Sequence, residues 1–429
     1  MSPAKNNIDN LLKQYLTTRQ KTVAICQPLE IEDYVIQPSA EVSPPKWHLG
    51  HTSWFFETLI LSKFNKNFKP YNSQYNQLFN SYYKALGTHT NQAERGHLSR
   101  PTVSEALEYR AYIDAQIVAN IVESSAENPL SLDFFTLLET AIHHEQQHQE
   151  LLYMDIKAIL SKNTLETRYS SAPLNPAPQP IIGWQSFEEG LYEIGANHLA
   201  FSPNNFSGDS FSYSSFSYDN ERPRHKHYQY PFSISQSLVS NGDFLAFIQD
   251  GAYSKAQYWL SQGWDWVQAQ NIHCPLYWSN IEGTWYEYTL HGLLPLDLNR
   301  PLVHISYFEA NAFANWKQLR LPTEQELEIF LTQSDTEQIQ KDSIHPNDAN
   351  AAYGQVWCWT SSQYAAYPQY KAFDGLLNEY NGKFMCNQFV LRGGCVVTPE
   401  GHYRHSYRNF YLAHQRWMFS GIRLAKDHC

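Results

Sequence analysis

The sequence predicts an α+β protein built from two domains, a helical bundle followed by a loop-rich domain of mixed structure. Two observations lead to this fold class. Over roughly the first 160 residues, apolar side chains recur three and four positions apart, which is the period of an α-helix. Beyond a proline-rich stretch, short apolar runs alternate with clusters of Gly, Asn, Asp and Ser, which is typical of short strands and turns. With 429 residues, the chain is long enough for two such domains with substantial cores.

The proline-rich stretch S-S-A-P-L-N-P-A-P-Q-P lies in a predicted linker, residues 166–182, which separates a bundle over 1–165 from a second domain over 183–429. A four-helix bundle with one long crossover is expected in the first domain. Its predicted helices cover residues 7–27, 46–61, 102–122 and 132–160. In the second domain only two segments read as helices, residues 241–253 and 308–317.

The composition excludes several classes of partner. Charged residues make up 17% of the chain, aromatic residues 15%, and the formal net charge is −11, so neither nucleic acid nor an anionic membrane is an expected partner. An aromatic-rich chain of this kind suits pockets for small polar ligands. No run approaches 18 apolar residues, and the N-terminus has no apolar signal segment. Six cysteines without a C-x-x-C pair indicate a cytoplasmic protein with reduced thiols.

The segment A-I-H-H-E-Q-Q-H-Q-E-L-L, residues 141–152, contains the first candidate site. His144 and His148 fall on the same helix face as Leu137, Ala141 and Leu151, and that face should point into the bundle core. An imidazole buried without a partner costs a few kcal/mol. A pair of them at positions i and i+4 therefore favours a shared divalent metal. The alternative is a pair of histidines that turn to the surface or form separate hydrogen bonds in the core.

A third histidine changes the balance between these interpretations. The motif W-H-L-G-H-T-S-W-F-F-E begins just after Pro44 and Pro45, a common helix start, and places His51 between Trp47 and Trp54. His51 therefore lies on a second inward-facing helix. Three inward histidines on two helices of one bundle favour a metal site over ordinary packing.

Several motifs resemble known families. The segments R-L-P-T-E-Q-E-L-E (320–328), V-W-C-W-T-S-S (356–362), L-R-G-G-C (391–395) and F-S-G-I-R-L-A (419–425) resemble the formylglycine-generating-enzyme fold, a C-type-lectin-like domain. The two histidine segments resemble the DinB-like bundle. With these two domains in this order, the chain resembles the ergothioneine-type sulfoxide synthases, which are non-heme iron enzymes. Three further motifs belong to the same pattern: Y-D-N-E-R-P-R-H (218–225), E-Y-N-G-K-F-M (379–385) and S-Y-R-N-F (406–410). The resemblance extends over essentially the whole chain.

This resemblance implies an O2-dependent enzyme of ergothioneine biosynthesis that forms a C–S bond between hercynine (Nα-trimethylhistidine) and a thiol and leaves a sulfoxide. It assigns Fe(II) to His51, His144 and His148. Three neutral imidazoles leave about three octahedral positions for two substrates and O2. By motif match, Gln147 hydrogen-bonds the hercynine imidazole. Asn409 and Phe410 surround its carboxylate and trimethylammonium, a cation that aromatic faces attract.

The resemblance also implies a catalytic tyrosine, whose position differs between branches of the family. Tyr82 and Tyr83, in N-S-Y-Y, match the branch that carries it on the bundle crossover. Because the chain has 29 tyrosines, most of them must serve packing or hydrogen bonding. Arg95, after this loop, matches an arginine that holds the carboxylate of the thiol substrate; the alternative is a solvated loop arginine.

The chain departs from the family pattern at two places. Branches that use γ-glutamylcysteine carry Asp and Arg where this chain has Tyr411 and Gln415 in the expected thiol site, which predicts the smaller donor, cysteine. Cys358 and Cys395 replace residues that are usually Glu and Ser; both fall in predicted strands and read as ordinary buried thiols.

Three other functions stay open at this point. The same architecture can join hercynine to a selenosugar through a C–Se bond. A zinc-dependent hydrolase or thiol transferase could use a three-histidine bundle, with metal-bound water as the nucleophile. A non-catalytic binding module could use the lectin-like half, but such a module has no need of the three histidines.

Overall fold

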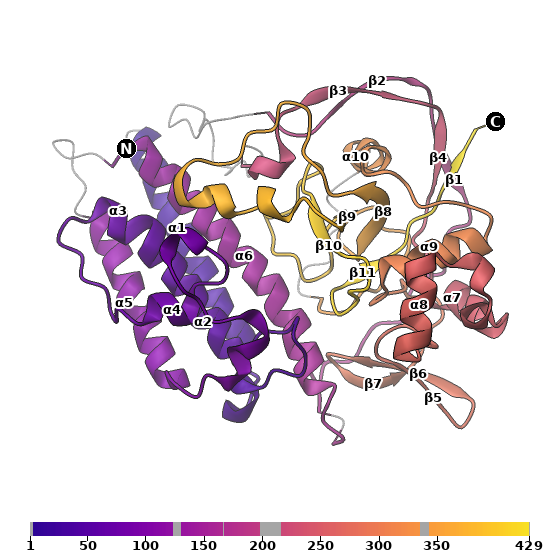
Figure 1. Ribbon diagram of the computed structural model, residues 1–429, viewed down its shortest axis with the longest axis horizontal. Helices are drawn as coiled ribbons and strands as arrows, with labels where there is room; N and C mark the ends of the chain where they lie inside the picture. The colour runs from indigo at the N-terminus through magenta and orange to yellow at the C-terminus, as the bar shows by residue number, and fades with distance from the viewer. Residues whose placement is uncertain (1–2, 123–129, 166, 198–215, 335–342, 429) are drawn as a thin grey trace.

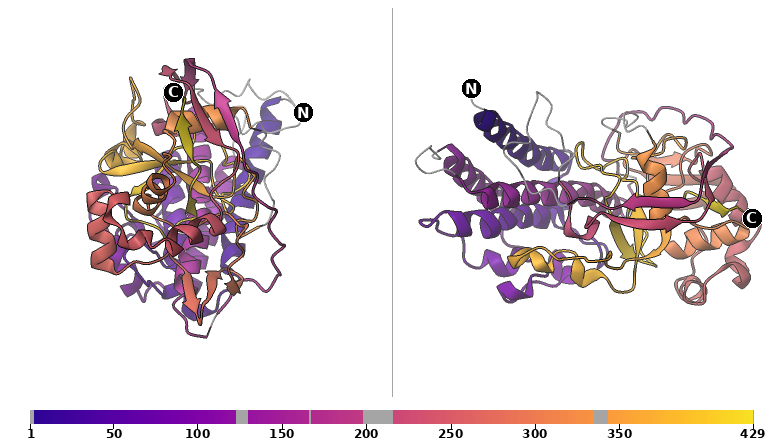
Figure 2. Two further views of the ribbon diagram at one scale, coloured as in Figure 1. Left: turned by 90° about the vertical axis from the view of Figure 1, so that its right-hand side faces the viewer. Right: turned by 90° about the horizontal axis from the view of Figure 1, so that it is seen from above.

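A computed structural model of the chain describes residues 3–122, 130–165, 167–197, 216–334 and 343–428. Figure 1 shows helices α1–α6 on one side of the molecule and the β-sheets on the other, and the predicted α+β class is confirmed. Seen from above in Figure 2, the two halves lie side by side along the long axis. In the part of the chain just described, no helix is both long enough and apolar enough to span a membrane.

The long helices of the first half form where the apolar period predicts them. They are α1 (Pro3–Cys26), α2 (Pro45–Phe56), α5 (Val103–Val122) and α6 (Leu132–Leu160). Helix α2 has Pro45 in its first turn, where a missing N–H costs nothing, and the hydroxyl of Ser131 caps α6 by accepting from the N–H of Phe134.

The α-helix predicted over residues 46–61 continues in the structure only to Phe56. A π-helical turn follows α2 over Glu57–Leu61 and leads into α3 (Ser62–Phe64). Within this turn, the carboxylate of Glu57 accepts hydrogen bonds from the Tyr109 hydroxyl and, at 3.2 Å, from the Tyr71 N–H. The crossover that follows contains a short helix, α4 (Tyr75–Phe79), which the sequence does not predict.

A buried ionic cluster fixes α6 against α1 and α5. The carboxylate of Glu145 accepts hydrogen bonds from Arg19 at 2.9 Å, from Thr22 at 2.5 Å and from Arg110. Burial by itself would raise the pKa of Glu145, but the two guanidinium groups lower it to about 2. Glu145 follows His144 directly, so this cluster sets the rotation of α6 at the histidine pair.

The described residues of the second half form four small sheets, and all of their strand pairs are antiparallel except β8–β11. Their orders are β1-β4-β12, β10-β9-β8-β11, β2-β3 and β5-β6-β7. The strands are β1 Trp184–Phe187, β2 Gly190–Ile194, β3 His225–Gln229, β4 Phe232–Ser235, β5 Trp278–Ile281, β6 Thr284–Thr289, β7 Gly292–Pro295, β8 Trp357–Gln363, β9 Gln388–Arg392, β10 Asn409–Leu412, β11 Ser420–Gly421 and β12 Ala425–Asp427.

The expectation of only two helices in this half was wrong. Besides α7 (Asn241–Gln249) and α9 (Tyr307–Trp316), the chain forms α8 (Ser261–Gln270) and α10 (Glu324–Thr332). Helix α8 contains Gly263, a poor helix former, because an added Cβ there would lie only 2.9 Å from the ring of Phe308. Helix α10 has several acidic residues on faces that are buried, which hides its apolar period.

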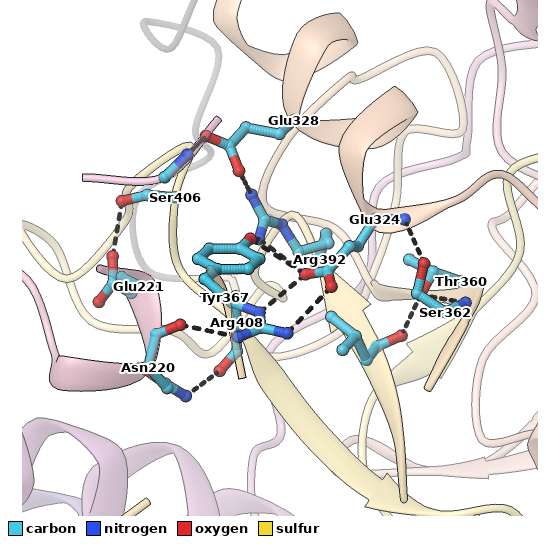
Figure 3. A network of polar contacts seen from close by, with 12 residues as sticks. Asn220, Glu221, Glu324, Glu328, Thr360, Ser362, Tyr367, Arg392, Ser406 and Arg408 are labelled. Carbon is cyan, nitrogen blue, oxygen red and sulfur yellow. Dashed lines mark hydrogen bonds and ion pairs between the residues drawn. The ribbon is translucent and has the colours of Figure 1, made fainter. Parts of the chain in front are cut away.

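Figure 3 shows that the motifs of the second half converge on one buried polar network. Arg408 binds Glu324 of α10 through two hydrogen bonds of 2.7 and 2.9 Å, and it donates at 2.8 Å to the carbonyl of Asn220. Arg392 of β9 binds Glu328 in the same network. Because Arg408 directly precedes β10, the network fixes the start of the strand that carries Asn409 and Phe410.

Helix α6 is buried by both halves of the molecule. From its polar side, Glu150 accepts from the Trp357 indole N–H at 2.7 Å, and Nδ1 of His143 lies 2.9 Å from Nδ1 of His402. Near its end, Nζ of the buried Lys157 lies 2.8 Å from Nε2 of His304. The second half therefore covers the face that the apolar stripe by itself would leave to solvent.

Five of the six cysteines lie among the described residues, and all five are free thiols. Cys358 lies in β8, but Cys395 follows β9 and belongs to no strand, so one of the two predicted strand positions was wrong. The turn that holds Cys395 begins with Gly393 and Gly394, both at positive φ, a conformation that ends the strand. Both thiols are buried, as expected of ordinary core cysteines.

Candidate metal centre and substrate cavity

The structure brings His51, His144 and His148 together. One ring nitrogen from each lies within 4.8 Å of the others, and all three side chains are buried. His51 comes from α2, while His144 and His148 lie one turn apart on α6. Nε2 of His51 is 3.2 Å from Nε2 of His144. The three rings therefore converge from two helices on one point.

The outer nitrogens of these rings indicate where the protons lie. Nδ1 of His51 donates to the carbonyl of Phe79 at 2.6 Å, which leaves the Nε2 lone pair facing the other two histidines. Nδ1 of His148 lies 2.8 Å from Nδ1 of His48. Nδ1 of His144 has no partner among the described residues, and its ring stacks on Phe55 at 3.7 Å.

The electrostatics of the site favour neutral rings. Burial and the neighbouring histidines lower the pKa of His51, His144 and His148 well below the usual value. Three neutral imidazoles with converging lone pairs are the donor set of a divalent transition metal. The residues present therefore fit a metal ion, with no carboxylate in the ligand set.

The histidines line a cavity of about 330 Å³ at the junction of the two halves. Such a volume is at the lower end of the range for small-ligand sites. His148 and Asn409 line this same cavity, the arrangement that shared binding of substrate and metal requires. The predicted site residues that line it are Tyr82, Arg95, Gln147, Asn409, Phe410 and Tyr411, together with the three histidines.

Gln147 is held by two tyrosines from the second half. Its Oε1 accepts a hydrogen bond from the hydroxyl of Tyr380, and its Nε2 donates to the hydroxyl of Tyr407 at 2.7 Å. These bonds fix the amide beside the candidate metal ligands, so Gln147 is not a solvated surface amide.

An aromatic wall also lines the cavity. Phe410 stacks on Tyr364 with ring centroids 4.0 Å apart, and the Phe384 ring lies 5.9 Å from that of Phe410 at an interplanar angle of 27°. Phe384, Phe410 and the neighbouring Asn409 line the cavity. Such a wall combines aromatic faces for a cation with an amide for a carboxylate.

The structure separates the two tyrosines of N-S-Y-Y. Tyr82 lines the cavity, and its hydroxyl donates at 3.4 Å to the carbonyl of Tyr380. Tyr83 stacks on Tyr82 but packs behind it, against Trp54 and Phe55, and is not a lining residue. Burial raises the pKa of both hydroxyls above the usual value, so both are neutral phenols.

Arg95 is buried, not a solvated loop residue. Its guanidinium stacks on Trp47 at 3.4 Å and donates to the Ser43 hydroxyl at 2.8 Å, while its Nε has no partner among the described residues. Burial lowers the pKa of Arg95 to about 9. A lining guanidinium with an unused N–H suits a carboxylate ligand.

Three residues at the site escaped prediction from the sequence. Tyr380 reaches Gln147 from a segment of short 3₁₀ turns, which the gold ribbon in Figure 1 traces over the bundle. The motif E-Y-N-G contained this tyrosine, but nothing local indicated which way it points. His48 contacts the candidate ligand His148, and Asp155 contacts His48. Both also line the cavity, and no spacing in the sequence links them.

Comparisons with known proteins agree with this architecture. Residues 14–152 match the family model of the DinB superfamily, and residues 204–352 match that of the sulfatase-modifying factor enzyme 1-like domain. A hercynine oxygenase of Mycolicibacterium smegmatis is 26% identical over 98% of this chain and 99% of its own length. Over almost its whole length the chain is therefore similar to the ergothioneine-type sulfoxide synthases, with both of their domains in the same order.

Two further relatives of this family are similar to the chain. A hercynine oxygenase of Mycobacterium tuberculosis is 30% identical over 49% of this chain and 56% of its own length. The ergothioneine biosynthesis protein 1 of Schizosaccharomyces pombe is 25% identical over 90% of this chain and 52% of its own length.

Proposed function

We propose that this protein is an Fe(II)- and O2-dependent enzyme of ergothioneine biosynthesis that joins hercynine to a thiol as a sulfoxide. One observation carries the proposal: the three histidines and the aromatic wall at Phe410 line one cavity. The names of the relatives, hercynine oxygenase and ergothioneine biosynthesis protein, support the same substrate and pathway.

The proposed reaction balances with O2 as the only oxidant. The imidazole carbon of hercynine loses its hydrogen, the thiol loses its proton, and a C–S bond forms. These steps and the oxidation of sulfur to sulfoxide release four electrons. O2 takes up all four, so that one oxygen atom enters the sulfoxide and the other leaves as water. Bound to the three histidines, Fe(II) would supply the redox chemistry and the binding position for the thiolate.

The residues of the chain position the two organic substrates. The faces of Phe384 and Phe410 suit the trimethylammonium group, and the Asn409 amide suits the carboxylate beside it. Gln147, held by Tyr380 and Tyr407, is placed to bind the imidazole. Arg95, which also lines the cavity, is the candidate for binding the carboxylate of the thiol. Tyr82 and Tyr380 have hydroxyls at the cavity from which a proton could be transferred.

The decisive experiment is anaerobic loading with Fe(II), followed by O2 uptake with hercynine and cysteine and mass spectrometry of the product. We expect a product with the mass of hercynine joined to cysteine plus one oxygen. If neither cysteine nor γ-glutamylcysteine supports O2 uptake, the proposal fails for thiols and a selenosugar donor should be tested. If that also fails, a zinc-dependent hydrolase becomes the better hypothesis.

Replacing the ligands provides the matching loss-of-function test. Asn in place of His51, His144 or His148 should abolish both bound iron and product, because two imidazoles hold a divalent metal weakly. His143→Asn is the matched control. His143 precedes His144 on α6, but it stacks on Phe216 and lies against His402, away from the three ligands. Retention of iron by all three ligand variants would contradict the proposed site.

A further inference from the structure

His148 differs from the other two candidate ligands in what lies behind it. His51 donates to a main-chain carbonyl, and His144 has no partner for its outer nitrogen among the described residues. His148 instead contacts a second histidine, since its Nδ1 lies 2.8 Å from Nδ1 of His48. Nε2 of His48 in turn lies 2.9 Å from Oδ2 of Asp155. All of these side chains are buried.

The Asp155 carboxylate joins three parts of the chain. Besides His48, it accepts a hydrogen bond at 2.9 Å from the N–H of Ser43, just before α2. Its other oxygen accepts at 3.1 Å from the indole N–H of Trp417, which belongs to the second half of the chain. Asp155 itself lies on α6, two turns after His148. The carboxylate therefore has a donor on each side and is fixed in orientation.

This arrangement determines which nitrogen of His148 carries a proton. Because Asp155 accepts from Nε2 of His48, a neutral His48 presents the lone pair of its Nδ1 to His148. Nδ1 of His148 must then carry a proton, which it donates to Nδ1 of His48. Nε2 of His148 is left with a free lone pair, which is the form that binds a metal.

We propose that Asp155 and His48 are positioning residues for His148, and that Trp417 makes this positioning depend on the contact between the two halves. The inference rests on the metal site of the proposed function, but it does not depend on the identity of the substrates. It assigns a role in metal affinity to three residues, none of which is itself a candidate ligand.

The test measures metal affinity and coordination, not turnover. The dissociation constant for Co(II) is measured anaerobically by competition with a chromophoric chelator, and the visible spectrum of bound Co(II) reports the ligand geometry. Melting of the metal-free protein is recorded in parallel. His48→Leu removes the acceptor for His148 and leaves Asp155 its two other donors; Asp155→Asn removes the charge.

We expect each of these two variants to bind Co(II) about 10- to 100-fold more weakly, with an altered spectrum, as is usual when a partner of a metal ligand is lost. A merely structural role would lower the melting temperature and leave the affinity and the spectrum of the folded protein unchanged. Affinities within twofold of wild type in both variants would overturn the inference. If the wild-type protein itself binds neither Co(II) nor Fe(II), the proposed function fails as well.

Trp417→Phe tests the link to the second half, since it removes a single N–H and keeps an aromatic ring. We expect a smaller loss of affinity, about two- to tenfold. Trp357→Phe is the matched control, because Trp357 also donates from the second half to a carboxylate on α6, that of Glu150. An equal effect of the two substitutions would show that general contact between the halves, and not the bond to Asp155, controls the metal site.

Discussion

The hydroxyl of Tyr380 donates a hydrogen bond to Oε1 of Gln147, the residue before the candidate ligand His148. The ring of Tyr380 also lies 5.9 Å from that of His144. A residue of the second half therefore reaches the candidate metal centre of the bundle. Tyr380 joins Tyr82 as a tyrosine at the cavity, whereas Tyr83 packs behind Tyr82.

Substituting each of these three tyrosines by Phe should show which of them contributes its hydroxyl to the reaction. We expect Tyr82→Phe and Tyr380→Phe to divert turnover from the sulfoxide toward simple oxidation of the thiol, because each removes a hydroxyl at the cavity. Tyr83→Phe is the matched control and should change the product ratio least. The ratio of sulfoxide to oxidised thiol is measured by mass spectrometry under single-turnover conditions. Unchanged ratios in both Tyr82→Phe and Tyr380→Phe would exclude a catalytic tyrosine at these positions.

Gly50→Ala should damage the metal site from behind. A Cβ at Gly50 would lie 2.1 Å from the ring of Phe79, whose carbonyl accepts from His51. Phe79 must move, so we expect weaker Co(II) binding and a loss of about 1–3 kcal/mol in the free energy of unfolding. This net loss means that the steric cost of the added Cβ should exceed the roughly 1 kcal/mol that alanine gains over glycine as a helix former.

Gly190→Ala is the control for this substitution. Only a side-chain atom of Tyr192, at 3.8 Å, would approach a Cβ at Gly190. Metal affinity should therefore match that of the wild type. A Gly50→Ala protein with wild-type affinity for Co(II) would show that the Phe79 carbonyl is not needed to orient His51.

The sulfur donor should be cysteine in preference to γ-glutamylcysteine. Tyr411 and Gln415 line the cavity and leave the second carboxylate of the dipeptide without a cationic partner at these positions. Comparing kcat/KM for the two thiols tests this prediction, and a preference for the dipeptide would contradict it. In the double variant Tyr411→Asp with Gln415→Arg, we expect the preference to move toward the dipeptide, with the single variants as controls.

Lowering the pH should reduce the free energy of unfolding of the bundle, because Glu145 becomes protonated. The pKa of this carboxyl is lowered to about 2 in the folded protein, so the ionised form stabilises the fold above its unfolded pKa of about 4.3. This contribution, about 3 kcal/mol, is lost as the pH falls from about 5 toward 2. Urea unfolding of the wild type and of Glu145→Gln over this range measures it. The difference in stability should shrink as the pH falls; a constant difference would contradict the assignment.

The sequence by itself determined the local features of the site. A repeat of three and four residues suffices to put His144 and His148 on one helix face, because the α-helix fixes the direction of each side chain from its spacing. The same rule placed His51 on α2, and the two-domain family followed from motifs spread along the chain. These features depend on interactions within a few turns.

Only the tertiary structure decided which groups meet at the cavity. Tyr380 and Gln147 are far apart in the sequence, as are Trp417 and Asp155, and no local period encodes such contacts. The same holds for α10, whose buried acids are compensated by Arg392 of β9 and by Arg408, which directly precedes β10. A charge can be buried only where a partner from elsewhere in the chain neutralises it, and that partner is chosen by packing of the whole molecule.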